Sequence, residues 1–269
     1  MSTTTTNNHH PNTKPKPKPK SAKPPSKPTR VYLTLYNLLS FTLWATSTVH
    51  ALSLLLLQQT PLPQIFTAVF PLLLATQSLA LLEILHSVVG LVRAPVFTTA
   101  MQVASRILLV WGIMYLFREG GVAVAGTGAG AGAGAGEAGR KGIVGVEGME
   151  GGEEQMQVQV QVADYGFLGC VFAWGITECI RYGFFVLQVS GLGVPAWWAW
   201  LRYNTFYVLY PLGITSECVM VVMALGPAAE WMPVYRWFLV VVLGIYVPGS
   251  YILYTHMIAQ RRKALKKKD

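Results

Sequence analysis

The sequence predicts an all-α membrane protein, a bundle of six transmembrane helices with both termini in the cytoplasm. Only 12% of its 269 residues are charged, whereas 52% are hydrophobic and the mean hydropathy is +0.42. A soluble domain carries about 25% charged residues. Of the 21 Lys and Arg, seven lie in residues 1–30 and six in residues 261–269. The net charge of +9 therefore belongs to two tails around an apolar body, which argues against a soluble enzyme and against nucleic-acid binding.

Six apolar runs define the expected spans. Each run is near or above the ~20 residues that a helix needs to cross a bilayer. Strands of a membrane barrel would be about half as long and would alternate in polarity. Because lipid offers no hydrogen bonds to the backbone, the runs must form helices. The expected spans are residues 31–57, 65–85, 96–117, 165–189, 197–225 and 237–258.

Lys and Arg near the spans set the expected orientation, because cytoplasmic flanks are enriched in them. Both tails are basic, so both are placed in the cytoplasm, as an even number of spans allows. The tail 1–30 is rich in Pro, Lys and Thr and is expected to be disordered. The loop 86–95 carries Arg93 and is placed inside. The loop 118–164, with three basic and seven acidic residues, is placed outside.

The loop 118–164 is expected to be an insertion in a transmembrane domain that covers residues 31–258. Its Gly/Ala run is typical of a low-complexity linker, and no GK[ST] follows that would indicate a phosphate loop. Its QVQVQV stretch alternates like a strand, but an isolated strand is not stable. We therefore expect the loop to be dispensable for chemistry.

The basic tail 259–269 ends with Lys266 and Lys267 at the fourth and third positions from the end. This arrangement resembles the dilysine retrieval signal of endoplasmic-reticulum membrane proteins, which requires a cytoplasmic tail. The alternative is a basic patch that binds the membrane surface.

Ionisable residues inside the apolar runs are the main functional candidates. Each costs about 2.5–3.5 kcal/mol at the middle of a membrane, so each needs a partner or a function. One alternative is a bundle held together by buried ion pairs, and Glu178 with Arg181, three residues apart, fits that alternative best. The full set comprises Glu83, Arg106, Glu178, Arg181, Arg202 and Glu217, with Gln77 and Gln102 as uncharged additions.

Tyr210 and Glu217 form the candidate catalytic pair. They lie seven residues apart, which is within about 20° of two helical turns, so both face the same side, about 10 Å apart along the axis. Pro211 between them is expected to bend the helix, and Gly213 permits close approach. A phenol and a carboxyl at one cavity suit acid–base chemistry. The alternative is an interfacial Tyr with a structural Glu.

Four ordered motifs resemble the very-long-chain 3-hydroxyacyl-CoA dehydratases, a family also called protein tyrosine phosphatase-like. The motifs are YLTLYNLLSFTLW, LLEILHSVVGLVRAPVFTTAMQVASR, WGITECIRYGFFV and LRYNTFYVLYPLGITSE. The resemblance covers nearly all of residues 31–258 except the Gly/Ala loop. It implies a six-span enzyme of the endoplasmic-reticulum membrane that performs the third step of fatty-acid elongation. That step removes water from a 3-hydroxyacyl-CoA and gives the trans-2-enoyl-CoA.

The resemblance also implies roles for individual residues. Tyr210 and Glu217 match the catalytic pair of the family. Elimination needs a base at C2 and an acid at C3, and we expect Tyr210 as base and Glu217 as acid, with the reverse assignment left open. Arg202, nearest the cytoplasmic face, is expected to meet the phosphates of CoA. The supporting residues implied are Arg202, Gly213, Glu83, Gln102, Arg106 and Arg181.

No metal or redox cofactor is expected, because the elimination needs only acid and base groups. The expected partners are the 3-hydroxyacyl-CoA substrate, membrane lipid and the other elongation enzymes, namely the condensing enzyme and the reductases.

Three other functions compete with the dehydratase. A catalytically inactive scaffold or lipid-binding protein of the same fold is disfavoured by the intact Tyr210 and Glu217. Inverted repeats in the sequence would favour a transporter, and none is evident. Residues 86–93 have the spacing of the Cys-phosphatase signature HCxxGxxR, but Ser87 stands where the nucleophilic Cys must be, which removes the thiolate mechanism.

Overall fold

The computed structural model describes residues 26–92, 96–119 and 150–266, and all regular elements in these ranges are helices. Within them, six segments are long and apolar enough to cross a membrane, so the prediction of a six-span, multi-pass all-α protein is confirmed. The helices are α1 (Lys27–Leu56), α2 (Leu62–Leu79), α3 (Leu81–Val88), α4 (Val96–Ile107), the π-helix η1 (Leu108–Glu119), α5 (Glu150–Ser190), α6 (Ala196–Asn204), α7 (Phe206–Trp231) and α8 (Pro233–Lys266).

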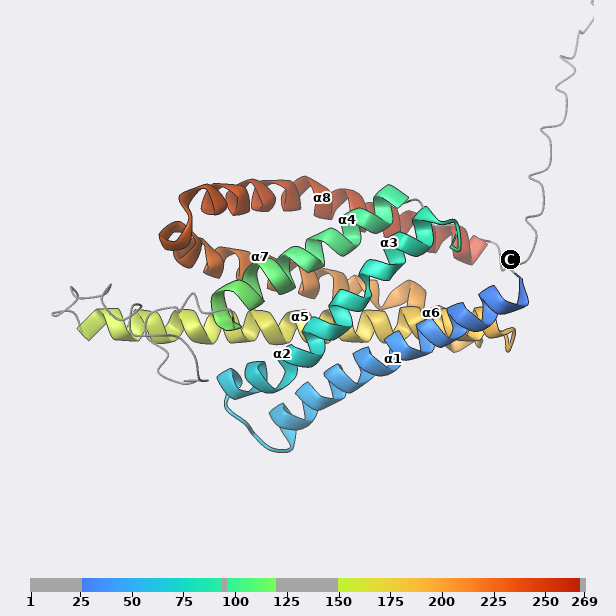
Figure 1. Ribbon diagram of the computed structural model, residues 1–269, viewed down its shortest axis with the longest axis horizontal. Helices are drawn as coiled ribbons and strands as arrows, with labels where there is room; N and C mark the ends of the chain where they lie inside the picture. Colours follow the sequence, from blue (N-terminus) through green and yellow to red (C-terminus); the bar gives the residue numbers. More distant parts are fainter. Residues whose placement is uncertain (1–25, 93–95, 120–149, 267–269) are drawn as a thin grey trace, which may run out of the picture.

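The long helices run up and down the bundle around α5, which packs against α1 on one side and α7 on the other (Figure 1). The outermost helix, α8, packs along α7. The start of α1, the link between α3 and α4, α6 and the end of α8 all lie at the same end of the bundle (Figure 1). Both ends of the described chain therefore lie on one side, as an even number of spans requires. Their placement in the cytoplasm stays a prediction.

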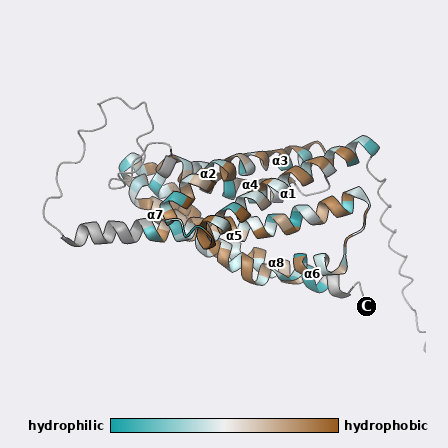
Figure 2. Cartoon of the chain, turned by 90° about the horizontal axis from the view of Figure 1, so that it is seen from below, coloured by the Kyte–Doolittle hydropathy of each residue, from teal (hydrophilic) through white to brown (hydrophobic). Residues whose placement is uncertain are grey.

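Apolar side chains cover the outside of the bundle as well as its interior. On α8, Trp237, Val241 and Val247 are 68%, 59% and 73% exposed. Figure 2 shows hydrophobic residues along the length of the long helices. Inside, large side chains from α1, α2, η1 and α5 form one core that includes Trp44, Phe70, Leu109 and Phe167. A lipid environment requires an apolar outer surface, because lipid offers no hydrogen bonds to polar groups. The backbone polar groups are satisfied within each helix.

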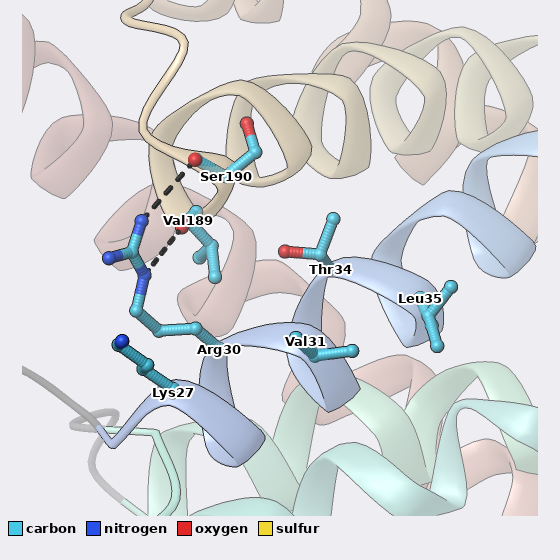
Figure 3. A pocket seen from close by; sticks show the side chains of 7 residues that line it. All are labelled: Lys27, Arg30, Val31, Thr34, Leu35, Val189 and Ser190. Atoms are coloured by element: carbon cyan, nitrogen blue, oxygen red, sulfur yellow. Dashed lines mark hydrogen bonds between the residues drawn. The ribbon is translucent and has the colours of Figure 1, made fainter.

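The first helix begins at Lys27, inside the segment 1–30 that we expected to be disordered. Pro28 lies in the first turn, where its missing N–H costs nothing. Arg30 donates from Nε to the Val189 carbonyl at 3.2 Å and from Nη2 to the Ser190 carbonyl at 3.3 Å. These hydrogen bonds cap the C-terminal end of α5. Arg30, Val189 and Ser190 also line an open pocket of about 440 Å³ between α1 and α5 (Figure 3). The expected disorder of residues 1–25 falls outside the described residues.

The fourth span is longer than predicted. Helix α5 begins at Glu150, so residues 150–164 of the predicted loop are helical. The Gln/Val alternation at 157–162 is therefore not a strand, and Gln and Glu are good helix formers. The Gly/Ala run of the loop lies outside the described residues.

Two predicted spans are interrupted. The second breaks at Ala80, between α2 and α3, and Pro71 stays inside α2. The fifth breaks at Thr205, so α6 and α7 replace the predicted single helix over residues 197–225. The last helix extends past the predicted end at 258 to Lys266. Arg93 and the last three residues, which include Lys267 of the proposed retrieval signal, lie outside the described residues.

Candidate functional site

Four charged side chains from three helices form what we term the ion-pair chain: Glu83, Arg106, Glu178 and Arg181. Arg181 donates to both oxygens of Glu83, at 2.7 Å and 3.0 Å, and from Nε to Glu178 at 2.5 Å. Arg106 donates to the other oxygen of Glu178. Two acids and two bases therefore compensate one another, and α3, α4 and α5 are tied together.

Glu178 is the centre of the ion-pair chain. Its side chain is only 3% exposed, and its two oxygens hold the two arginines. Tyr182, one helical turn along α5, donates its hydroxyl to Glu83, and Arg181 lies over the Tyr182 ring at 4.1 Å. The sequence predicted the Glu178–Arg181 pair as structural, and the structure extends that pair to Arg106, 72 residues away.

Glu217 lies in a different environment, near the middle of α7. It is buried, and each of its oxygens accepts one hydrogen bond from a neutral donor. Trp174 of α5 donates from Nε1 to Oε1 at 2.8 Å, and Tyr246 of α8 donates from its hydroxyl to Oε2 at 2.9 Å. The carboxyl is thus held between two helices, and no cationic side chain in the described part of the chain pairs with it directly.

Tyr210 also faces α8. Its hydroxyl donates to the Ser250 carbonyl at 3.2 Å, and its ring stacks on Tyr254 with the centroids 5.7 Å apart. Tyr210 and Glu217 therefore contact the same neighbouring helix, and no hydrogen bond joins them among the described residues. Helix α7 continues through Pro211 without a break.

The Trp174 ring separates the ion-pair chain from Glu217. The Arg106 guanidinium carbon lies 5.5 Å from the centroid of this ring, whose Nε1 binds Glu217. The distance is within the range of a cation–π contact. The Trp174 indole therefore contacts both Arg106, over its ring, and Glu217, at its N–H.

The remaining candidates, Gln102 and Gly213, lie one helical turn before Arg106 and Glu217, respectively. Gln102 is exposed on α4, so it does not join Arg106 at the site. Gly213 is buried where α7 packs on α5, and a Cβ built there would lie 3.5 Å from Ala173 Cβ, an ordinary contact. A Cβ at Gly169 would come within 3.0 Å of Ser216 Cβ and closer still to its hydroxyl. The close approach of α5 to α7 therefore depends on Gly169 more than on Gly213.

Arg202 lies on α6, outside the spans, at the end of the bundle where α1 begins (Figure 1). Its guanidinium lies over Phe184 at 4.4 Å and over Phe185 at 4.9 Å. Burial lowers the pKa of Arg202 from its ordinary value. No carboxylate within the described ranges pairs with it. The charge is thus available for an anionic group.

Sequence reasoning missed Trp174 and Tyr246, which hold Glu217. A helical-spacing search could have found the first, because Trp174, Glu178 and Arg181 lie at i, i+4 and i+7 on one face of α5. Tyr246 has no such signal, because its partner lies on another helix. In the part of the chain that the structure describes, no group of three His, Cys, Asp or Glu could hold a metal ion.

Comparison with known proteins identifies relatives along most of the chain. A family model described as protein tyrosine phosphatase-like protein, PTPLA, matches residues 77–267. The chain is 34% identical to the very-long-chain (3R)-3-hydroxyacyl-CoA dehydratase PASTICCINO 2 of Arabidopsis thaliana, over 88% of this chain and 94% of that protein. The chain is also 34% identical to a probable very-long-chain (3R)-3-hydroxyacyl-CoA dehydratase of Schizosaccharomyces pombe, over 88% of this chain and 93% of that protein. No solved structure matches.

Proposed function

We propose that this chain, which belongs to the protein tyrosine phosphatase-like family, dehydrates very-long-chain 3-hydroxyacyl-CoA to trans-2-enoyl-CoA. Its membership follows from the family match over residues 77–267. The substrate class comes from relatives named as very-long-chain (3R)-3-hydroxyacyl-CoA dehydratases, which align over nearly their whole length. Removal of water without hydrolysis would make the chain a hydro-lyase.

The observation that carries the proposal is the environment of Glu217. A carboxyl in an ion pair is committed to its cation, whereas the donors that bind Glu217 among the described residues, Trp174 and Tyr246, are neutral. Tyr210 supplies a phenol on the same helix, two turns away, and also faces α8. A buried acid and a phenol directed to one helix interface suit an elimination that needs one base and one acid.

In the proposed reaction, one of these two groups takes the proton from C2 of the acyl chain. The electron pair of that C–H bond forms the C2–C3 double bond as the C3–O bond breaks. The other group gives its proton to the departing hydroxyl, which leaves as water. Tyr210 as base with Glu217 as acid, or the reverse, gives the same balance of protons. A hydrogen-bond donor at the thioester oxygen would stabilise the enolate-like charge.

We place the reaction in the endoplasmic-reticulum membrane, as the third step of fatty-acid elongation, with both termini in the cytoplasm. In this orientation Arg202 lies at the cytoplasmic end, where its unpaired guanidinium would meet the CoA phosphates. The proposed partners are the other enzymes of elongation. These are the condensing enzyme and the reductases that supply the 3-hydroxyacyl-CoA and reduce the enoyl product.

The experiment uses the full chain purified in detergent with a long-chain (3R)-3-hydroxyacyl-CoA and measures formation of the enoyl product. Tyr210→Phe and Glu217→Gln should each lower turnover by about 10²–10⁴-fold, the usual contribution of acid–base catalysis. Tyr251→Phe is the control, because Tyr251 lies on α8 but is 72% exposed. Normal turnover in both site variants would overturn the assignment, and an inactive wild-type chain would favour the scaffold alternative.

A further inference from the structure

The Glu217 carboxyl is held from two directions. Trp174 and Tyr246 bind different oxygens of the carboxyl, at 2.8 Å and 2.9 Å, and they belong to different helices, α5 and α8. Both distances are typical of good hydrogen bonds. Two donors at two oxygens fix the plane of the carboxyl as well as its position, which a single hydrogen bond would leave free to rotate.

We propose that Trp174 and Tyr246 are positioning residues, which hold Glu217 in the orientation that the elimination requires. The inference rests on the proposed function of the chain. An arginine or lysine in either place would also orient the carboxyl, but its charge would tie Glu217 into an ion pair. An indole N–H and a phenol O–H orient the group and add no charge.

Trp174 is itself fixed by its surroundings. It is 3% exposed, and the guanidinium of Arg106 lies over its ring. Arg106 is held in turn by Glu178 at the centre of the ion-pair chain. The indole therefore has little freedom to turn, and its N–H stays directed at Glu217.

Tyr246 belongs to a stripe on α8 that serves both proposed catalytic residues. Tyr246, Ser250 and Tyr254 lie at i, i+4 and i+8 and share one helix face. Tyr246 binds Glu217, whereas Ser250 and Tyr254 contact Tyr210 through a carbonyl and a ring. One face of α8 therefore contacts both the acid and the phenol, whose separation along α7 is set by their spacing of seven residues.

The test measures kcat and KM separately for Tyr246→Phe and Trp174→Phe. Each substitution keeps an aromatic ring and removes the donor. We expect kcat to fall by about 10²-fold in each variant, the cost of a misplaced catalytic group, with KM unchanged. Matched controls are Tyr251→Phe and Trp237→Phe, whose side chains are 72% and 68% exposed on α8.

A double-mutant cycle separates positioning from a structural role. If Tyr246 acts only through Glu217, Tyr246→Phe should cause no further loss in a Glu217→Gln background. An equal loss in both backgrounds, a wild-type kcat in Tyr246→Phe and Trp174→Phe, or a change in KM alone would each overturn the proposal. Loss of folding in both single variants would also overturn it, because their role would then be structural.

The two proposals fail in different ways. If the wild-type chain does not dehydrate the substrate, the proposed function fails, and the positioning role fails with it. If the wild-type chain is active and Glu217→Gln matches it, the catalytic assignment of Glu217 and the positioning role fail, while the dehydratase function stands. If Glu217→Gln is inactive while Tyr246→Phe and Trp174→Phe match the wild type, only the positioning role fails.

Discussion

Two buried acids in this bundle, Glu178 and Glu217, lie in opposite electrostatic surroundings. Glu178 binds two arginines and forms the centre of a neutral chain of four charges. Glu217 binds an indole N–H and a phenol O–H. The indole is also the point where the two regions meet, because Arg106 lies over its other atoms. The difference separates two uses of a buried carboxyl: one holds helices together, and the other exchanges a proton in the proposed mechanism.

The largest expected effect is on stability, and it tests the Glu178 side of this comparison. Glu178→Gln leaves Arg106 without a carboxylate partner among the residues that the structure describes and leaves Arg181 with Glu83 alone. Removing one partner of a buried ion pair costs about 3–5 kcal/mol. Glu217→Gln should cost only about 1 kcal/mol, a single neutral hydrogen bond. The free energy of unfolding in mixed detergent micelles measures both, and equal losses would contradict the comparison.

A smaller effect is expected at Arg202, which lies outside both regions. If its unpaired charge binds the CoA phosphates, Arg202→Ala removes a charged hydrogen bond of about 1.5–3 kcal/mol. The apparent KM should then rise about 10- to 100-fold, and kcat should stay constant. Arg236→Ala is the control, because Arg236 is exposed at the opposite end of the bundle. An unchanged KM would remove Arg202 from the binding site.

The smallest effect concerns the packing of α5 on α7 beside Glu217. An alanine at Gly169 would press on Ser216, the residue before Glu217, and overpacking costs about 1–3 kcal/mol. Gly213→Ala makes an ordinary contact with Ala173 and should cost less. The free energy of unfolding of both variants tests this difference, because Gly169→Ala would also press on the residue next to Glu217. A larger loss in Gly213→Ala would contradict this packing.

The spans and the charged candidates could be predicted from the sequence because both depend on local features. The length of the apolar runs gives the number of membrane spans, and a charge inside such a run is visible in one window of residues. The partners could not be predicted in this way. Glu178 meets Arg106 across 72 residues, and Tyr246 meets Glu217 across two helices, so neither contact leaves a periodic trace.

Helix boundaries were predicted less well, for identifiable reasons. The run over residues 197–225 is long enough for a single span, and the polar residues Arg202, Asn204 and Thr205, which lie where α6 ends and α7 begins, do not by themselves predict a break. The residues from Glu150 to the apolar part of α5 are polar and were assigned to the loop, although Gln and Glu favour helices. Gln102 shares a helix face with Arg106 by spacing, but its side chain is exposed, because helical spacing alone does not set how much of a face is buried.

Helix α8 is the last helix that the structure describes, and it packs along α7, with a further contact to η1 through Tyr235. It nevertheless provides a contact for Tyr210 and for Glu217 alike. A nonsense mutation that ends translation before residue 246 would leave the five preceding spans in place and remove both contacts. Completion of the proposed site therefore depends on α8, although most of the hydrophobic core lies in the other helices.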